Sequence, residues 1–298
     1  MKLKAEGWAW VGRLSGFAGL FIAFALVLAV AAAGIARLAG IEVPATVGWW
    51  TVAPALLAAC AATWVLTVRI DGRPLSALGL RGGRAGLSEL GYGTLAGFAI
   101  IGVVILALAL PGWVSWTAPG GAAVLSGAEI SILLLGAAFT EELLFRGYAF
   151  RVLHLRFGPV PALAGTSVAF GLMHGANPGI TPLALVNLAL AGVLLGVAYW
   201  RSGSLWFVTG VHFGWNWIMA ASGLSVSGLD VRISGLEAVL SGPALWTGGG
   251  FGPEAGLVAT VMTALGTVWL WRISGSADRP VGARWSISET PGDDDASV

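Results

Sequence analysis

The sequence predicts an all-α membrane protein, a polytopic bundle of about eight transmembrane helices. Hydrophobic residues make up 57% of the 298 positions and charged residues only 10%, whereas a soluble domain carries about 25% charged residues. The mean hydropathy of the chain is +0.84. Its apolar residues are gathered in runs that approach the ~20 residues an α-helix needs to cross a bilayer.

Eight apolar segments meet or approach this length. The first follows two lysines, as in a signal peptide, but its apolar run of about 23 residues exceeds the ~7–15 of a signal peptide. We therefore expect a retained helix there. The fifth segment begins after a Gly-Pro pair, which favours the start of a new helix. The segments are 14–36, 48–68, 90–110, 126–150, 159–174, 181–200, 205–221 and 253–271.

Lysine and arginine are distributed unevenly between these segments. If the N-terminus is cytoplasmic, only Arg37 and Arg232 fall in loops on the opposite side, and Arg146 falls inside a helix. Because cytoplasmic loops carry an excess of Lys and Arg, we expect a multi-pass membrane protein with both termini cytoplasmic. The basic residues on the cytoplasmic side would be Lys2, Lys4, Arg13, Arg69, Arg73, Arg81, Arg84, Arg151, Arg156, Arg201, Arg272, Arg279 and Arg284.

The chain divides into four predicted regions. Residues 1–125 hold three transmembrane helices and a cytoplasmic loop, and residues 126–221 form a four-helix core that carries the candidate catalytic residues. Residues 222–271 comprise an outside loop rich in glycine and the last transmembrane helix. Residues 272–298 lack apolar periodicity and contain three consecutive aspartates, which predicts a disordered cytoplasmic tail.

The composition also excludes several classes of function. With 16 basic and 15 acidic residues the net charge is +1, so the chain lacks the basic surface of a nucleic-acid binder. Its one cysteine, Cys60, excludes an internal disulfide framework and a Cys-based zinc cluster. The partner that the composition predicts is the lipid bilayer.

A small set of polar side chains falls inside the predicted membrane helices. Ionisable groups are costly in that environment and usually serve a function. This makes them the candidates for a site. They are Glu141, Glu142 and Arg146 in the fourth segment, His174 in the fifth, and His212 and Asn216 in the seventh.

The spacing of these residues predicts how they are grouped. Glu142 and Arg146 are four residues apart, so they can pair on one helix face. Glu141 is rotated by about 100° from Glu142, so the two carboxylates face different neighbours. Glu141 and His174 lie at nearly equal distances along the chain from Gly158. An antiparallel hairpin turning near Gly158 brings these two residues to a similar depth.

A glutamate and two histidines can activate water in two ways. Glu141 can act as a general base on a water that attacks a carbonyl, while Asn216 and one histidine donate hydrogen bonds to the oxyanion. Alternatively, Glu141, His174 and His212 can bind Zn²⁺ with an open position for water. The sequence does not separate these schemes, so zinc is a possible cofactor and none is certain.

Three motifs in this part of the chain resemble those of a known family. EELLFRG (141–147), FGLMH (170–174) and HFGWN (212–216) occur in that order. They look like the motifs of the CPBP intramembrane proteases, which group the type II CAAX prenyl endoproteases with bacterial Abi and bacteriocin-processing homologues. The resemblance covers about residues 126–220.

The resemblance implies a role for each polar residue. Glu141 is implied as the catalytic carboxylate, with His174 and His212 around the attacking water and Asn216 completing the oxyanion site. The other two residues would orient the first motif. The implied catalytic set is Glu141, Glu142, Arg146, His174, His212 and Asn216.

We therefore expect an intramembrane endopeptidase, glutamic or metal-dependent, that hydrolyses a peptide bond of a membrane-associated and potentially lipidated substrate. Two other functions stay open. The same buried residues can relay protons in a transporter, or the chain can be a non-catalytic immunity or scaffold protein. For Glu142 and Arg146, a buried structural ion pair is the alternative to a catalytic role.

Overall fold

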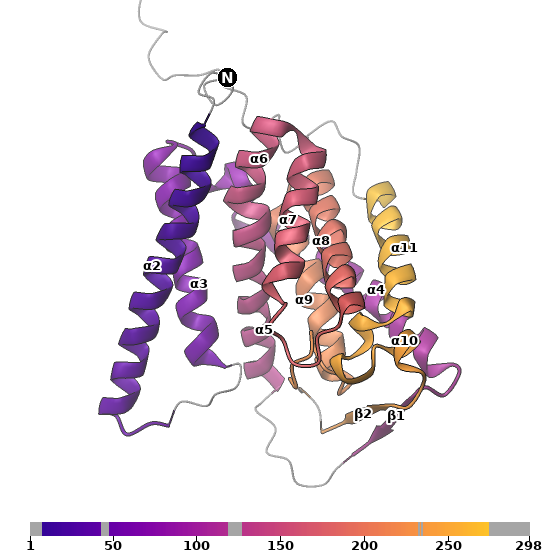
Figure 1. The fold of residues 1–298 in the computed structure, drawn as a ribbon. Coiled ribbons are helices and arrows are strands. Elements are labelled where there is room, and N and C mark those ends of the chain that lie inside the picture. Colours follow the sequence, from indigo (N-terminus) through magenta and orange to yellow (C-terminus); the bar gives the residue numbers. More distant parts are fainter. Residues whose placement is uncertain (1–7, 43–47, 119–126, 232, 234, 274–298) are drawn as a thin grey trace, which may run out of the picture.

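The predicted all-α membrane bundle is confirmed by the computed structural model, which describes residues 8–42, 48–118, 127–231, 233 and 235–273 (Figure 1). Each of the eight predicted segments contains a helix. The long helices are α2 (Ala9–Leu38), α3 (Trp49–Trp64), α4 (Gly83–Ala109), α5 (Gly127–Glu142), α6 (Ala149–Phe157), α7 (Pro159–Met173), α8 (Pro182–Ser202), α9 (Leu205–Ala221) and α11 (Leu257–Ile273).

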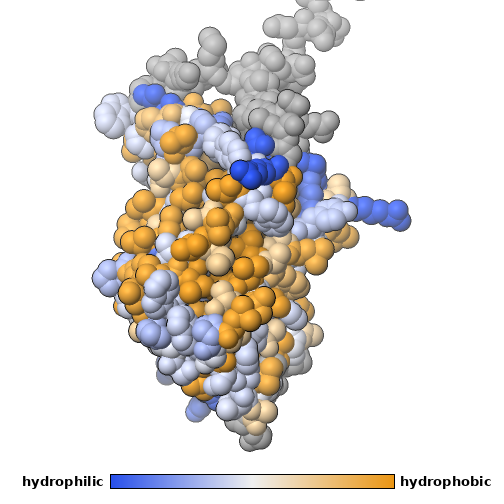
Figure 2. Space-filling model, turned by 90° about the vertical axis from the view of Figure 1, so that its right-hand side faces the viewer, coloured by the Kyte–Doolittle hydropathy of each residue, from blue (hydrophilic) through white to orange (hydrophobic). Residues whose placement is uncertain are grey.

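Several of these helices have the length and composition of membrane spans. Among the described residues, four helical segments qualify on both counts, and α7 and α11 are shorter apolar helices. Apolar side chains gather across the middle of the face drawn in Figure 2. These features suggest an integral membrane protein, while the number of eight spans and the orientation of the termini stay predictions. The four segments are Ala9–Leu38, Trp49–Ile70, Leu75–Ala109 and Pro182–Ser202.

One end of the bundle, which we term the loop end, carries short irregular elements that the sequence did not predict. There β1 (Val114–Thr117) pairs antiparallel with β2 (Glu237–Leu240). The loop end consists of β1 and residues 174–181, 222–231 and 235–256, and the predicted tail beyond residue 273 lies outside the described residues. Its remaining elements are α10 (Ala244–Thr247), η4 (Gly249–Phe251) and η5 (Pro253–Ala255).

Local start signals determine where the core helices begin. Gly158, with a φ of 89°, separates α6 from α7. Thr181 caps α8, because its hydroxyl accepts a hydrogen bond from the backbone N–H three residues later at 3.1 Å. Ser204 caps α9 in the same way at 3.1 Å. Such caps satisfy backbone N–H groups that have no partner within the helix, and they fix the register of the residues that follow.

Helix α9 packs against α4 through glycines on both helices. A Cβ atom added at Gly93 or Gly97 of α4 would collide with backbone carbonyls of α9, and one at Gly210 or Gly214 would collide with α4. Both pairs have the G-x-x-x-G spacing that allows membrane helices to approach closely. The close contact holds rigidly the helix that carries His212.

Two of the helices contain π-helical turns. Helix α3 continues into η1 (Val65–Ile70), and α5 continues through η3 (Leu143–Tyr148) into α6. Within η3, Gly147 has a non-helical ψ of −113°. Single π-turns inside α-helices often occur at functional sites. Here the irregular turn follows directly after the two glutamates of the first motif.

Candidate active site

The most buried part of the predicted site is an ion pair on the fourth predicted segment. Arg146 Nη1 donates to Glu142 Oε1 at 3.0 Å, and both side chains are fully buried. Arg146 Nη2 donates to the carbonyl oxygen of Gly192 on α8 at 2.9 Å. The predicted pairing of Glu142 with Arg146 is therefore present, and the same guanidinium also joins α5 and η3 to α8.

His212 lies between the two glutamates. Its Nδ1 donates to Glu142 Oε1 at 2.8 Å, and its Nε2 lies 3.8 Å from Glu141 Oε2. An ionised carboxylate only accepts hydrogen bonds, so Nδ1 carries the proton. In the neutral imidazole, Nε2 then presents a lone pair towards Glu141. Glu142 thereby determines which nitrogen of His212 is available for chemistry.

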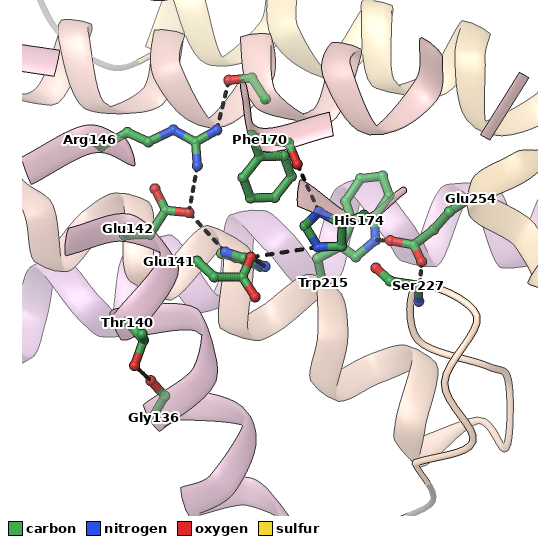
Figure 3. Close-up of polar contacts among 12 residues, drawn as sticks. Gly136, Thr140, Glu141, Glu142, Arg146, Phe170, His174, Trp215, Ser227 and Glu254 are labelled. Carbon is green, nitrogen blue, oxygen red and sulfur yellow. Dashed lines mark hydrogen bonds and ion pairs between the residues drawn. The ribbon is translucent and has the colours of Figure 1, made fainter. Parts of the chain in front are cut away.

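His174 also directs its Nε2 towards Glu141, but a different hydrogen bond holds its ring. It lies directly after α7, where its Nδ1 donates to the carbonyl oxygen of Phe170 at 2.8 Å. A carbonyl oxygen only accepts, so the neutral imidazole again carries its lone pair on Nε2. This Nε2 lies 3.8 Å from Glu141 Oε2 (Figure 3).

The three side chains therefore converge on one point. Glu141 Oε2 is 3.8 Å from the Nε2 atoms of both His174 and His212, too far for a direct hydrogen bond. This oxygen is buried and has no hydrogen-bond partner among the described residues. A water oxygen about 2.8 Å from Glu141 Oε2 and about 2.8 Å from a histidine Nε2 fits a separation of 3.8 Å between those two atoms.

Asn216 lies one turn after His212 on α9 and lines a cavity with it. The cavity has a volume of about 20 Å³, enough for about one water molecule, and its lining is mostly apolar. The side chain of Asn216 makes no hydrogen bond with the described part of the chain, although the residue is only 9% exposed. Its amide N–H groups are therefore free to donate to a ligand. The remaining lining residues are Phe170, Leu188, Ala191, Leu194, Leu195, Val211, Trp215, Ser227 and Glu254.

The structure adds a buried carboxylate that sequence reasoning missed. Glu254 in η5 accepts hydrogen bonds from Trp215 Nε1 at 2.9 Å and from the backbone N–H of Ser227 at 2.5 Å (Figure 3). The available signal was an acidic residue at the edge of an apolar segment, far along the chain from the three motifs. Nothing in its spacing connects it to Trp215.

Glu141, His174 and His212 are also the donor set for a metal ion that the sequence leaves open. No group of three or more His, Cys, Asp or Glu side chains within the described ranges is placed to hold one. Glu141, His174 and His212 supply the donor atoms that the sequence offered for zinc, with Glu141 Oε2 at 3.8 Å from each histidine Nε2. We therefore derive no chemical step through a metal.

Comparison with known proteins gives one match. A family model described as "Type II CAAX prenyl endopeptidase Rce1-like" matches residues 123–218. No curated protein and no solved structure matched the chain. The matched third of the chain contains all six predicted site residues. Over residues 123–218 the protein is thus similar to the Rce1-like type II CAAX prenyl endopeptidases, which confirms the resemblance predicted from its three motifs.

Proposed function

We propose that the protein is an intramembrane endopeptidase in which Glu141 activates a water molecule. The observation that carries the proposal is the position of Glu141 Oε2, 3.8 Å from the Nε2 atoms of His174 and His212. The match over residues 123–218 independently suggests a protease of the CAAX endopeptidase type.

The first step is the attack of water on the peptide carbonyl. The lone pairs of both Nε2 atoms and the Glu141 carboxylate all face the space between them, so a water there can donate to two of the three acceptors. One of its protons passes to Glu141 as the water oxygen bonds to the carbonyl carbon. An imidazole accepts the other hydrogen bond and orients the water.

The second step is the collapse of the tetrahedral intermediate. The N–H groups of Asn216, which have no partner among the described residues, donate to the oxyanion. Glu141 returns its proton to the leaving nitrogen as the C–N bond breaks. The products are a carboxylic acid and an amine, and the Glu141 carboxylate is regenerated.

Glu142 and Arg146 support this chemistry without touching the substrate. The guanidinium of Arg146 balances the charge of Glu142 in a fully buried pair. Glu142 in turn holds the Nδ1–H of His212. Glu141 has no guanidinium partner within the part of the chain described, so its carboxylate stays available as a base.

The substrate that fits this site is a membrane-associated protein or peptide. The catalytic groups lie on helices whose surroundings are apolar, so the scissile bond has to reach them at the membrane. The printed name of the matched family refers to prenylated CAAX substrates. For this chain we propose a broader class of substrate, a lipid-bound or lipid-modified polypeptide.

The test is a cleavage assay in detergent or nanodiscs with a panel of membrane-bound fluorogenic peptides. Glu141→Gln and His174→Ala should abolish cleavage. Glu129→Gln is the matched control, because Glu129 lies on the same helix but contacts Trp49 at 3.1 Å, away from the site. Cleavage that survives Glu141→Gln would exclude the mechanism. Glu141-dependent proton flux into liposomes without hydrolysis would instead indicate a transporter, and protection that survives Glu141→Ala an immunity or scaffold protein.

A further inference from the structure

Glu254 is a buried acidic residue outside the three motifs and outside the matched segment. It lies in η5, directly before α11, and is 7% exposed. Its carboxylate accepts from two N–H donors, the indole of Trp215 at 2.9 Å and the backbone of Ser227 at 2.5 Å. Burying a carboxylate is costly, so its position calls for a compensating role in the structure.

The first donor places Glu254 beside the residues of α9 that form the site. Trp215 comes directly before Asn216 and three residues after His212. All three line the cavity of about 20 Å³, together with Glu254 itself. The hydrogen bond to Glu254 therefore fixes the indole that forms a wall of the cavity next to both polar residues.

The second donor connects Glu254 to the loop on the His174 side. Ser227 donates its N–H to Glu254, and its carbonyl oxygen accepts from Asn177 Nδ2 at 2.8 Å. Asn177 lies three residues after His174, and its backbone N–H donates to the carbonyl oxygen of His174 at 3.0 Å. A continuous chain of hydrogen bonds thus runs from Glu254 through Ser227 to the turn that carries His174.

Ser227 itself is held in an uncommon backbone conformation. Its φ of 50° is the one positive value at a non-glycine residue in the described ranges. A conformation of this kind persists when surrounding contacts hold it, and such residues cluster at functional sites. The contacts here are the hydrogen bonds from Asn177 and to Glu254.

The backbone of η5 is held separately from the carboxylate. Asn187 on α8 donates from Nδ2 to the carbonyl oxygens of Glu254 at 2.8 Å and Gly256 at 2.9 Å. Its Oδ1 accepts from Thr260 at 2.7 Å. A change at Asn187 therefore loosens the loop without altering the carboxylate, which provides a matched control.

We propose that Glu254 is a positioning residue of the active site, which holds Trp215 and the Ser227 loop in place beside His212, Asn216 and His174. The inference rests on the proposed peptidase function. The positioning role needs a side chain that accepts from the N–H groups of Trp215 and Ser227 at the same time. A carboxylate does this, whereas an amide of the same size presents an NH₂ group to one of them.

The test compares Glu254→Gln, Glu254→Leu, Trp215→Phe and the double variant Glu254→Gln/Trp215→Phe. The kcat for peptide cleavage should fall at least about tenfold in each single variant, more for Leu than for Gln, with little change in KM. The double variant should lose no more than the worse single variant, because the two changes remove one shared contact.

Two controls separate positioning from a general loss of stability. Trp217 lies on the same helix as Trp215, and its indole donates to Ser131 of α5 at 2.8 Å. Trp217→Phe removes this hydrogen bond and should leave kcat unchanged. Asn187→Ala should lower the melting temperature in detergent while the folded fraction keeps its kcat. The proposal is overturned if both Glu254 variants keep the wild-type kcat. It is also overturned if Asn187→Ala lowers kcat as much as the Glu254 variants do.

A second readout does not require peptidase activity. Glu254→Gln should increase the hydrogen-exchange rate of residues 224–229 and the rate at which diethyl pyrocarbonate modifies His212, each at least about twofold. If the wild-type protein cleaves no peptide and these rates still rise, the peptidase function fails and the positioning role stands. Unchanged rates overturn the positioning role whatever the peptidase result.

Discussion

The carboxylate of Glu142 and the imidazole of His212 form a buried hydrogen bond of 2.8 Å between α5 and α9, although 70 residues separate them in the sequence. The same oxygen of Glu142 also accepts a hydrogen bond from Arg146 at 3.0 Å, so it has two donors. It also directs the Nε2 of His212 towards Glu141. Glu142 therefore acts on the site through His212, as a positioning residue.

We predict that Glu142→Gln lowers kcat by about 10- to 100-fold with little change in KM. The neutral amide oxygen accepts more weakly from Arg146 and His212 than the charged carboxylate does, and weakened outer contacts to a functional histidine typically have effects of this size. Steady-state cleavage of the best peptide measures it, with Glu129→Gln as the control on the same helix. A folded Glu142→Gln protein with wild-type kcat would show that Glu142 is structural only.

Arg146→Ala should lower the free energy of unfolding by about 3–5 kcal/mol, because it leaves the buried charge of Glu142 without its partner. The comparison is Arg81→Ala, whose ion pair with Glu89 at 2.7 Å is partly exposed and should contribute no more than about 1 kcal/mol. Thermal melting in detergent measures both. Equal melting temperatures for the two variants would contradict the burial of the Arg146 pair.

Chelation should leave peptide cleavage unchanged. The described ranges contain no group of three or more His, Cys, Asp or Glu side chains placed to hold a metal ion, and the proposed mechanism uses the carboxylate directly. Cleavage is measured after treatment with EDTA and with 1,10-phenanthroline, beside metal analysis of the active protein. Loss of activity that Zn²⁺ restores would replace the glutamic mechanism by a metal-dependent one.

Gly97→Ala should destabilise the protein, and Gly102→Ala on the same helix should not. A methyl group at Gly97 meets the backbone of α9, whereas nothing lies within 4 Å of one at Gly102. Overpacking of this kind costs about 1–3 kcal/mol, while alanine in place of an unhindered helical glycine is favourable by about 0.8–1 kcal/mol. Melting temperatures should therefore move in opposite directions. A common direction would mean that α4 and α9 are less closely packed than described.

The sequence predicted the helices and the group of polar residues because both depend on local patterns. Apolar runs determine where helices form, and a spacing of four residues predicted the contact between Glu142 and Arg146. The similar depth of Glu141 and His174 followed from their positions around Gly158. That His212 contacts both glutamates required the packing of α9 against α5, which no spacing along one helix contains.

The features that the sequence did not predict arise from contacts between distant segments. Glu254 meets Trp215 only because the loop end folds back over the bundle, and β1 pairs with a strand more than a hundred residues away. The short strands have no apolar run to mark them. The π-helical turn η3 was also missed, because its sequence has the composition of an ordinary α-helix.

The π-turn η3 interrupts the regular helix directly after Glu141 and Glu142 and contains Arg146. A π-turn accommodates one residue more than the regular helix around it, so deleting a single residue such as Leu144 would restore uniform α-helical winding. The shortened helix would gain regularity, and the residues of α6 beyond the turn would stay in phase with α5, but Arg146 would follow Glu142 by three residues in place of four. The extra residue of the π-turn thus alters the winding only between the glutamates and α6, the stretch that holds Arg146.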